Sequence, residues 1–278
     1  MNKLILVLLL FLCFNSIAQN DIDSPIYLCK YSFDWQKDST DLFSKSNDKM
    51  YLEIGKNSST FYSNNHLTGY LNFLEDLKAR RSIDYVQANA YRYYKNSETE
   101  IIIHNFETKE FKVIDKLSAT TSGITYCYFD SVENPIWKLE PDTLTILNQL
   151  CQKASTTFKG RDYIAWFAPD IPYSLGPWQF TGLPGLILKI NDTKNQITFV
   201  AIEIGNDTPS KVTEIEYPNC LPTEKSKVRK LRKLKAQNSL AFEKIQHPNL
   251  TFTFRNNAGE IIQPSNKLRP YNPIDLSK

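Results

Sequence analysis

The sequence predicts a β-rich α+β fold: one large, mainly antiparallel sheet, open-barrel-like in shape, covered by two helices. Three observations carry this prediction. Segments of alternating apolar and polar residues recur along the chain, and such alternation is typical of strands with one buried face. Turn residues separate neighbouring segments, and only two stretches place apolar residues at helical spacing. A sheet of about ten strands needs curvature to enclose one core.

The N-terminal half begins with the clearest strand pattern of the chain. From Tyr27 to Trp35 every second residue is aromatic or cysteine, while Lys30, Ser32 and Asp34 lie between them. This alternation is typical of a half-buried antiparallel strand. Apolar residues at helical spacing predict a short amphipathic helix over 65–81. The other strands expected in this half lie at 50–54, 59–63, 88–94, 100–106, 111–114, 124–129, 137–139 and 147–158.

The C-terminal half supplies the second helix and the last strands. Residues 186–190 and 197–204 are apolar on both faces, so we expect this hairpin to lie centrally with both faces covered. A further strand is expected at 212–217, and a last hairpin of 250–254 with 260–262 precedes a tail, from Pro264 on, that we expect to be frayed. A helix over 224–246 is expected to cover the concave face of the sheet. Its apolar stripe consists of Val228, Leu231, Leu234, Phe242 and Ile245.

This second helix is strongly basic outside its apolar stripe. Between Lys225 and Lys235, seven residues are Lys or Arg. One interpretation is attraction to anionic lipid head groups or to an acidic partner. The other, which we favour, is an ordinary solvated helix face. The whole chain carries a formal net charge of only +3, which is too small to indicate a nucleic-acid partner.

The N-terminus has the features of a secretory signal peptide. Lys3 precedes an apolar run from Leu4 to Phe14, and Ser16-Ile17-Ala18 follows as a small-x-small cleavage pattern. We therefore expect residues 1–18 to be removed and residues 19–278 to form a single domain, periplasmic or secreted. No other long apolar run follows, so no transmembrane segment is expected after cleavage.

Four cysteines follow the predicted signal peptide: Cys29, Cys127, Cys151 and Cys220. An even number in an exported chain predicts at least one disulfide, and three pairings are open. The alternative is that the cysteines are reduced and packed as small apolar side chains. Their spacing matches no zinc site. A nucleophilic role for Cys151 is less favoured, because no histidine lies near it in the sequence.

Residues 159–191 are the segment whose residue choices are most constrained. A strand at 162–167 leads into a loop broken by prolines and by Gly176-Pro177. Leu183-Pro184-Gly185-Leu186 has the form of a type II turn. The simpler interpretation is that the aromatic side chains here plug one end of the sheet. The alternative is a rigid platform that binds a ligand, and the residues expected to bind it are Arg161, Trp166, Tyr173, Trp178, Phe180 and Pro184.

The same segment carries a family resemblance. Gly182 to Ile187 spells G-L-P-G-L-I, and it follows Cys151-Gln-Lys-Ala154, Gly160-Arg161, Ala165-Trp166 and Gly176-Pro-Trp178. With these motifs the chain resembles the GLPGLI family of exported proteins of Gram-negative bacteria. The resemblance implies an envelope or secreted location and no established activity, so no catalytic residue is carried over. Members often place Gly-Tyr before the Cys-Gln-Lys-Ala strand, where this chain has 148–150 as Asn-Gln-Leu.

No catalytic signature accompanies these motifs. The three histidines, His66, His104 and His247, are not spaced as metal ligands. The sequence has no nucleophile elbow, phosphate-binding loop or dinucleotide fingerprint. No metal and no cofactor is therefore expected.

The sequence thus favours a non-enzymatic binding or accessory protein of the cell envelope. Its partner would be an apolar ligand, a peptide or another envelope protein. Two alternatives stay open. One is a hydrolase with its site near Arg161, Asp162, Asp170 or Cys151, and the other is a structural or assembly component of the envelope.

Overall fold

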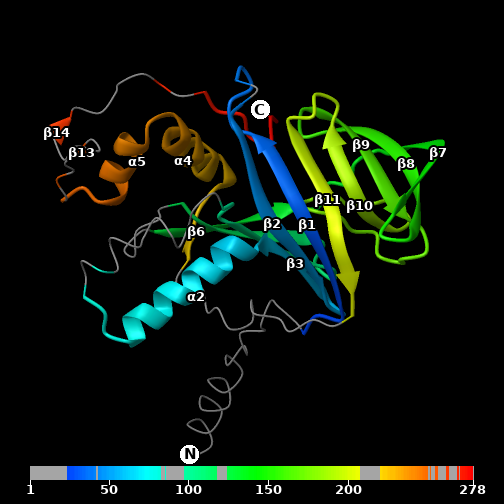
Figure 1. The fold of residues 1–278 in the computed structure, drawn as a ribbon, viewed down its shortest axis with the longest axis horizontal. Coiled ribbons are helices and arrows are strands. Elements are labelled where there is room, and N and C mark those ends of the chain that lie inside the picture. Colours follow the sequence, from blue (N-terminus) through cyan, green and yellow to red (C-terminus); the bar gives the residue numbers. More distant parts are fainter. Residues whose placement is uncertain are drawn as a thin grey trace, which may run out of the picture.

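The computed structural model is built around one strongly curved sheet of twelve strands (Figure 1). It describes residues 24–41, 43–82, 85, 97–117, 124–206, 220–249, 251, 254–255, 261–262, 268 and 270–277. The strand order is β12-β6-β5-β4-β3-β2-β1-β11-β10-β9-β8-β7. All neighbours pair antiparallel except β12 with β6, which pair in parallel. The sheet has two edges, β7 and β12, and is not closed, so the predicted β-rich, open-barrel-like fold is confirmed.

The strands of this sheet are β1 (Tyr27–Gln36), β2 (Lys45–Ile54), β3 (Ser58–Ser63), β4 (Glu100–Asn105), β5 (Glu110–Lys116), β6 (Thr125–Ser131), β7 (Lys138–Ile146), β8 (Gln149–Phe158), β9 (Arg161–Ala168), β10 (Leu186–Asp192), β11 (Ile197–Gly205) and β12 (Leu221–Pro222). A separate pair is formed by β13 (Phe254–Arg255) and β14 (Ile261–Ile262). The helices are α2 (Asn64–Lys78), α4 (Lys225–Gln237) and α5 (Ser239–Gln246). The strands predicted at 88–94 and 212–217 lie outside the described residues.

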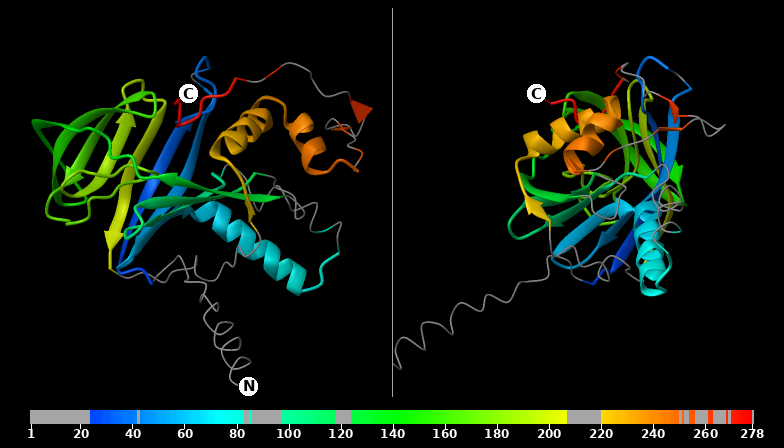
Figure 2. Two further views of the ribbon diagram at one scale, coloured as in Figure 1. Left: turned by 180° about the vertical axis from the view of Figure 1, so that it is seen from behind. Right: turned by 90° about the vertical axis from the view of Figure 1, so that its left-hand side faces the viewer.

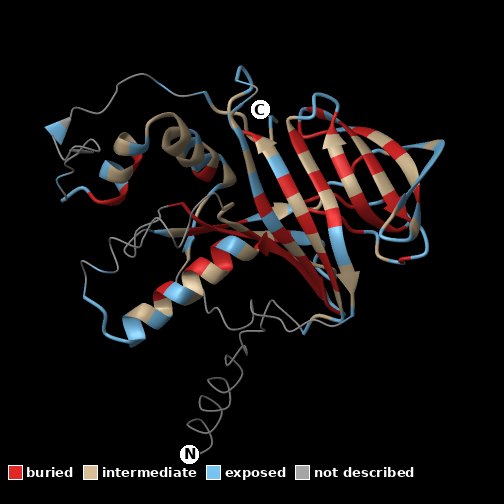
Figure 3. Cartoon of the chain, viewed as in Figure 1, coloured by how far each residue is buried: buried red, intermediate tan, exposed pale blue. Residues whose placement is uncertain are grey.

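Helices cover both faces of the half of the sheet that contains β4–β6. Two views show α2 on one side of these strands and α4 with α5 on the other (Figures 1 and 2). Alternation along the strands explains this, because Ile101 and Ile103 pack with Leu67 of α2. Ile102, between them, belongs instead to the main core, which includes Val228 of α4. Bands of buried and less buried residues alternate in the same way along the central strands (Figure 3).

The helix predicted over 224–246 is two helices, which corrects the expected number from two to three among the described residues. Asn238 separates α4 from α5, and its side chain accepts a hydrogen bond of 3.0 Å from the Ala241 backbone N–H. An N-terminal cap of this kind starts a new helix. The apolar stripe therefore does not continue through the break: Val228 and Phe242 are buried, while Ile245 is 56% exposed.

The edge strand β7 is mostly exposed and was predicted only as 137–139. Pro141 lies within the stretch of β7 where the register shifts, as expected for a proline on an edge strand. The turn into β8 consists of Leu147 and Asn148, both with positive φ. Two such residues form the tight turn that fits a two-residue hairpin, so this turn is made without glycine.

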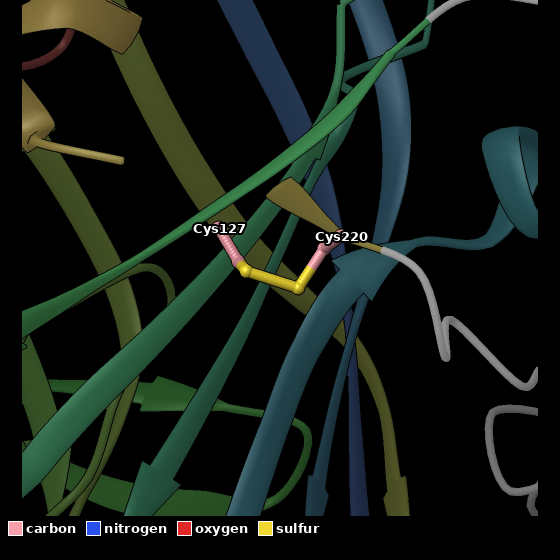
Figure 4. Close-up of a disulfide and its surroundings, with 2 residues drawn as sticks. All are labelled: Cys127 and Cys220. Carbon is pink, nitrogen blue, oxygen red and sulfur yellow. A yellow bond between two sulfur atoms is a disulfide. The ribbon is translucent and has the colours of Figure 1, made fainter. Parts of the chain in front are cut away.

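One disulfide joins Cys127 in β6 to Cys220, which lies just before β12 (Figure 4). Their Cα atoms are 5.5 Å apart, and they are separated by 93 residues in the sequence. The prediction of at least one disulfide is confirmed, while Cys29 and Cys151 are free and buried. The disulfide holds the start of the α4 segment against the β6 edge. None of the described helices is long and apolar enough to span a membrane.

Candidate functional site: a helix-covered cavity on the concave face

The aromatic loop between β9 and β10 is packed against the sheet. The backbone N–H groups of Leu186 and Ile187 donate to the carbonyl oxygens of Ile171 (3.1 Å) and Leu175 (2.9 Å). Trp137 Nε1 donates to the Thr181 carbonyl oxygen at 2.8 Å. These bonds satisfy loop backbone that would otherwise be buried unpaired, so the loop has a fixed shape.

Phe180 is the centre of this packing and is only 1% exposed. Its ring centroid lies 4.8 Å from Tyr163, 5.5 Å from Trp178 and 5.6 Å from Phe158. Tilted and edge-on contacts of this length add about 0.5–1.5 kcal/mol per pair beyond burial. Phe180 is therefore a core side chain that anchors the loop.

The predicted type II turn at Leu183–Leu186 is not formed. Instead the Gly185 N–H donates to the Leu183 carbonyl oxygen at 2.8 Å, a bond across Pro184 alone. Gly185 has φ +153°, and a Cβ on it would overlap the Ala168 carbonyl oxygen. The glycine of the motif is required because the chain crosses the end of β9 at close range.

Trp178 adopts a conformation that is rare for its residue type. Its φ is +55°, in the left-handed region that costs roughly 1–2 kcal/mol for an L-residue. It is buried against Phe158 and Phe180 and also lines a large cavity. Strained backbone of this kind is common at binding sites, and here it directs an indole ring from the loop to the cavity.

The cavity has a volume of about 1050 Å³ and lies between the sheet and α4. Its apolar wall comes from the concave face of β1, β3 and β11. Phe33 stacks on Trp35 at 4.7 Å and on Phe199 at 4.2 Å, and Phe61 lies 6.0 Å from Phe199. Four aromatic rings thus form one continuous row along the cavity, with Trp178 from the loop as a further contact.

The opposite wall is the basic face of α4. Lys225, Arg229 and Arg232 line the cavity and are paired with acids. Lys225 Nζ lies 2.5 Å from Asp130, and Arg229 lies 3.9 Å from Asp275. Arg232 Nε lies 2.6 Å from the buried carboxylate of Asp115, and its terminal nitrogens reach Glu98 and Glu100 at 3.3 and 3.4 Å. These three bases are therefore neutralised within the fold.

Three other lysines that line the cavity have no such partner. Lys230, Lys233 and Lys235 form no ion pair with any residue in the described part of the chain. Lys230 and Lys233 are exposed, and Lys235 is half-buried. Burial lowers the pKa of Lys235, although Asp115 nearby acts in the opposite direction. The cavity wall thus presents unpaired positive charge beside an aromatic surface.

Buried acids accompany Arg232 at one end of the cavity. Burial, with Asp115 and Glu98 close by, raises the pKa of Glu100 to about 7 even though Arg232 opposes the shift. A carboxyl group that is buried near other carboxylates resists ionisation in this way. Within the described residues no group of His, Cys, Asp and Glu is arranged to hold a metal ion.

The third wall of the cavity is the C-terminal segment, residues 270–276. Arg161 Nη2 donates to the Asn272 side chain at 2.5 Å and to the Pro273 carbonyl oxygen at 2.6 Å. The Leu276 N–H donates to the Lys159 carbonyl oxygen at 2.8 Å. This segment lies beside the β1 and β9 ends of the sheet (Figure 1), so the expectation of a frayed tail is wrong for 270–277.

Arg161 is held by its own buried ion pair. Its Nη1 lies 3.1 Å from Asp192 Oδ2, and the two side chains are 4% and 3% exposed. The other oxygen of Asp192 accepts hydrogen bonds from the backbone N–H groups of Gln196 and Ile197. Arg161 thus joins the turn between β10 and β11 to the C-terminal wall of the cavity.

The structure separates the six residues expected to bind. Trp178 lines the cavity, and Arg161 reaches it through the C-terminal segment. Phe180 is buried in the core behind Trp178. Trp166 is partly buried and alternates with buried Ala165 and Phe167 along β9, so its side chain lies on the other face of this strand. The remaining two stand apart from the cavity lining: Tyr173 packs on Tyr27 at 5.2 Å, and Pro184 is exposed.

The residues named for a hydrolytic site are not brought together either. Arg161 is buried, whereas Asp162 is exposed and accepts a bond from Thr157 at 2.6 Å. Asp170 is exposed in the loop, and Cys151 is buried in β8. Burial raises the pKa of the Cys151 thiol to about 11, which disfavours the thiolate that a nucleophile needs.

Sequence reasoning missed most of the cavity. Phe33 and Trp35 were recognised as one face of a strand, but nothing in the alternation distinguishes a filled core from a cavity wall. The lysines of α4 were recognised as a basic face. The signal that could have found them is the expectation that this helix covers the concave face, because side chains beside its apolar stripe then border the enclosed space.

Comparisons with known proteins found similarity in two respects: the constrained segment around residues 159–191, and the fold. A family model described as a protein of unknown function (Porph_ging) matches residues 156–189, which include β9, the aromatic loop and most of β10. None of the curated proteins matches the chain.

Solved structures similar to this chain include PNGF-II in a P21 space group, with a TM-score of 0.50 at 12% identity. The similarity covers 74% of this chain and 33% of that chain, so this chain spans about a third of the length of that protein. PNGF-II in a C2 space group gives a TM-score of 0.49 at 12% identity, over 74% and 32% of the two chains. At this identity the likeness to the first concerns the fold alone.

Proposed function

We propose that this chain is an exported, non-enzymatic binding protein that holds an apolar ligand in the helix-covered cavity. The observation that carries the proposal is the cavity itself, about 1050 Å³ beside a continuous row of aromatic rings. Ligand sites of roughly 300–1,000 Å³ are mostly apolar with a few placed polar groups. This cavity is slightly larger than the top of that range and has both kinds of lining.

The aromatic loop has a defined part in this function. Its hydrogen bonds and the buried Phe180 fix its shape before any ligand arrives, and Trp178 then contributes a ring to the cavity. Preorganised contacts lose little conformational entropy on binding. The loop is therefore a rigid support for one wall of the cavity.

We further infer membership of the GLPGLI family and a location in the cell envelope or outside the cell. The motif at Gly182–Ile187 and the family-model match over 156–189 support the first inference. The signal-peptide pattern at 1–18 supports export. The disulfide between Cys127 and Cys220 also supports it, because disulfides persist in oxidising compartments.

A neutral, apolar fluorophore, N-phenyl-1-naphthylamine, tests whether the cavity binds apolar ligands. Ala236 of α4 lines the cavity, while its neighbour Gln237 is not among the lining residues of the described chain. We expect saturable binding by the wild-type protein and by Gln237→Trp, and at least tenfold weaker binding by Ala236→Trp, which places an indole ring in the cavity. Circular dichroism would check that both variants are folded. Absence of binding by the wild type, or equal loss in both variants, would refute the proposal.

A further inference from the structure

The cavity has a chemical asymmetry that apolar binding alone does not explain. One wall is the row formed by Trp35, Phe33, Phe199 and Phe61. The facing wall is the basic side of α4. A ligand in contact with both walls would place an apolar part on the rings and a polar part at the helix.

The positive charge on that wall is only partly compensated. Acids neutralise three of its bases, but Lys230, Lys233 and Lys235 pair with none of the described residues, and all three line the cavity. Lys37 also lines the cavity, with its ammonium group 5.2 Å from the centre of the Trp35 ring. An ammonium group that is partly removed from water gains most from an anionic partner.

Lys235 carries this argument furthest, because it is half-buried. Burial lowers its pKa, which means that the fold does not fully replace the water that a charged ammonium group loses. Asp115, Glu98 and Glu243 act on Lys235 without forming an ion pair with it, so an acidic group bound in the cavity would supply a direct partner. The lysine ammonium group is a point charge on a flexible chain, so it can bind either a carboxylate or a phosphate.

We propose that the cavity binds single-chain amphiphiles with an acidic head group, the chain lying on the aromatic row and the head group at Lys235. Lys230 and Lys233, which helix geometry places on the opposite edge of the cavity-facing side of α4, add to the positive potential of this wall. This proposal rests on the proposed binding function and specifies its ligand class. The lysines and the aromatic rings line the same cavity, so one ligand molecule can contact both.

Matched ligands test the head-group claim. Binding of palmitate, hexadecyl phosphate and hexadecanol would be measured by calorimetry, below the concentrations at which each aggregates. A charge-assisted hydrogen bond contributes about 1.5–3 kcal/mol, so we expect the two acids to bind at least tenfold more tightly than the alcohol. Acetate and inorganic phosphate, which have the head groups without the chain, should bind at least tenfold more weakly than the acids. A preference for palmitate over hexadecyl phosphate, or the reverse, identifies which acid the site takes.

Lysine variants locate the head group. Lys235→Gln is expected to reduce palmitate affinity by at least fivefold and Lys233→Gln to reduce it less, and both should leave hexadecanol affinity unchanged. Lys227→Gln is the control, because Lys227 is an exposed residue of the same helix that does not border the cavity in the described chain. Bound palmitate should also slow the acetylation of Lys235, measured by mass spectrometry, and leave that of Lys227 unchanged.

The outcomes separate the two proposals. If hexadecanol binds the wild type as tightly as palmitate, the head-group proposal is overturned while apolar binding stands. If the acids are preferred but Lys233→Gln, Lys235→Gln and Lys227→Gln behave alike, the head group lies elsewhere and this assignment is wrong. If no chain-bearing compound and no apolar fluorophore binds, both proposals fail.

Discussion

Gly160 and Leu276 meet at the point where the C-terminal segment crosses the start of β9. Gly160 has φ +80°, and a Cβ on it would lie 2.9 Å from the Leu276 Cβ atom. Beside this contact, the Leu276 N–H donates a hydrogen bond to the Lys159 carbonyl oxygen. Gly160 and Arg161 therefore hold the C-terminal segment in place, and this segment forms one wall of the cavity.

Replacing Gly160 by alanine should loosen the C-terminal segment. The positive φ alone costs roughly 1–2 kcal/mol with a Cβ present, and Leu276 must also move. We expect a loss of at least about 1 kcal/mol in urea unfolding and faster cleavage of the tail by carboxypeptidase. Gly205→Ala is the control, because a Cβ there meets nothing within 4 Å; it should change stability by less than about 0.5 kcal/mol. Equal effects of the two substitutions would contradict this role of Gly160.

Most of the sheet could be predicted from the sequence, because strands with one buried face show alternating apolar and polar residues. In β1 the alternation from Tyr27 to Trp35 corresponds to the face that contains buried Cys29, Tyr31 and Phe33. The edge strand β7 shows no such alternation, since nearly all of it is exposed and Pro141 interrupts it. A strand without a buried face has no alternation to read.

Features that depend on distant parts of the chain could not be predicted. The hydrogen bond between Arg161 and Asn272 joins residues 111 apart in the sequence, and neither residue alone indicates the other. The break at Asn238 was hidden because an apolar stripe can be drawn through it, although Ile245 then lies exposed. Trp178 and Phe180 lie two residues apart in the same loop, and only the fold shows that Trp178 lines the cavity while Phe180 is buried in the core.

The disulfide between Cys127 and Cys220 should contribute strongly to stability. It closes a long loop, 93 residues in sequence separation, and disulfides typically stabilise by about 2–4 kcal/mol. The double variant Cys127→Ala/Cys220→Ala should lose stability in this range. In the native wild type, Cys29 and Cys151 should resist alkylation because both are buried, and non-reducing peptide mapping should recover the Cys127–Cys220 pair. Recovery of a Cys29–Cys151 pair would contradict the structure.

Acid should destabilise the fold through His66. Burial lowers the pKa of His66 from 6.5 to about 4 in the folded protein. The unfolded chain takes up the proton first, so the stabilising contribution is present above about pH 6.5 and is lost as the pH falls toward 4. The shift corresponds to about 3 kcal/mol.

His66→Gln tests this pH dependence. The fall in unfolding free energy between pH 7 and pH 4.5, measured by urea titration, should be smaller in the variant by on the order of 2–3 kcal/mol. Comparing variant with wild type cancels the contributions of other groups, including His104, whose pKa burial also lowers to about 4. Identical pH profiles, or an NMR titration of His66 near pH 6.5, would show that the side chain is not buried as described.

Removing only one partner of the ion pair between Arg161 and Asp192 should greatly lower the free energy of unfolding. Both side chains are at least 96% buried, and removal of one partner leaves an uncompensated buried charge, which typically costs 3–5 kcal/mol. Arg161→Met should therefore destabilise the protein by about that amount and should also release the segment at Asn272 and Pro273, which its guanidinium holds.

A double-mutant cycle with Asp192→Asn separates the ion pair from the other bonds that the two side chains make. Removing both charges avoids the unpaired carboxylate, so Arg161→Met/Asp192→Asn should lose clearly less stability than the sum of the single variants. The more exposed pair Lys153–Glu140 provides the comparison, with side chains 23% and 24% exposed; its coupling should be much smaller because solvent screens it. If the Arg161–Asp192 coupling were equally small, burial would not be what makes this pair important. The C-terminal wall of the cavity would then depend on the hydrogen bonds of Arg161 to Asn272 and Pro273 alone.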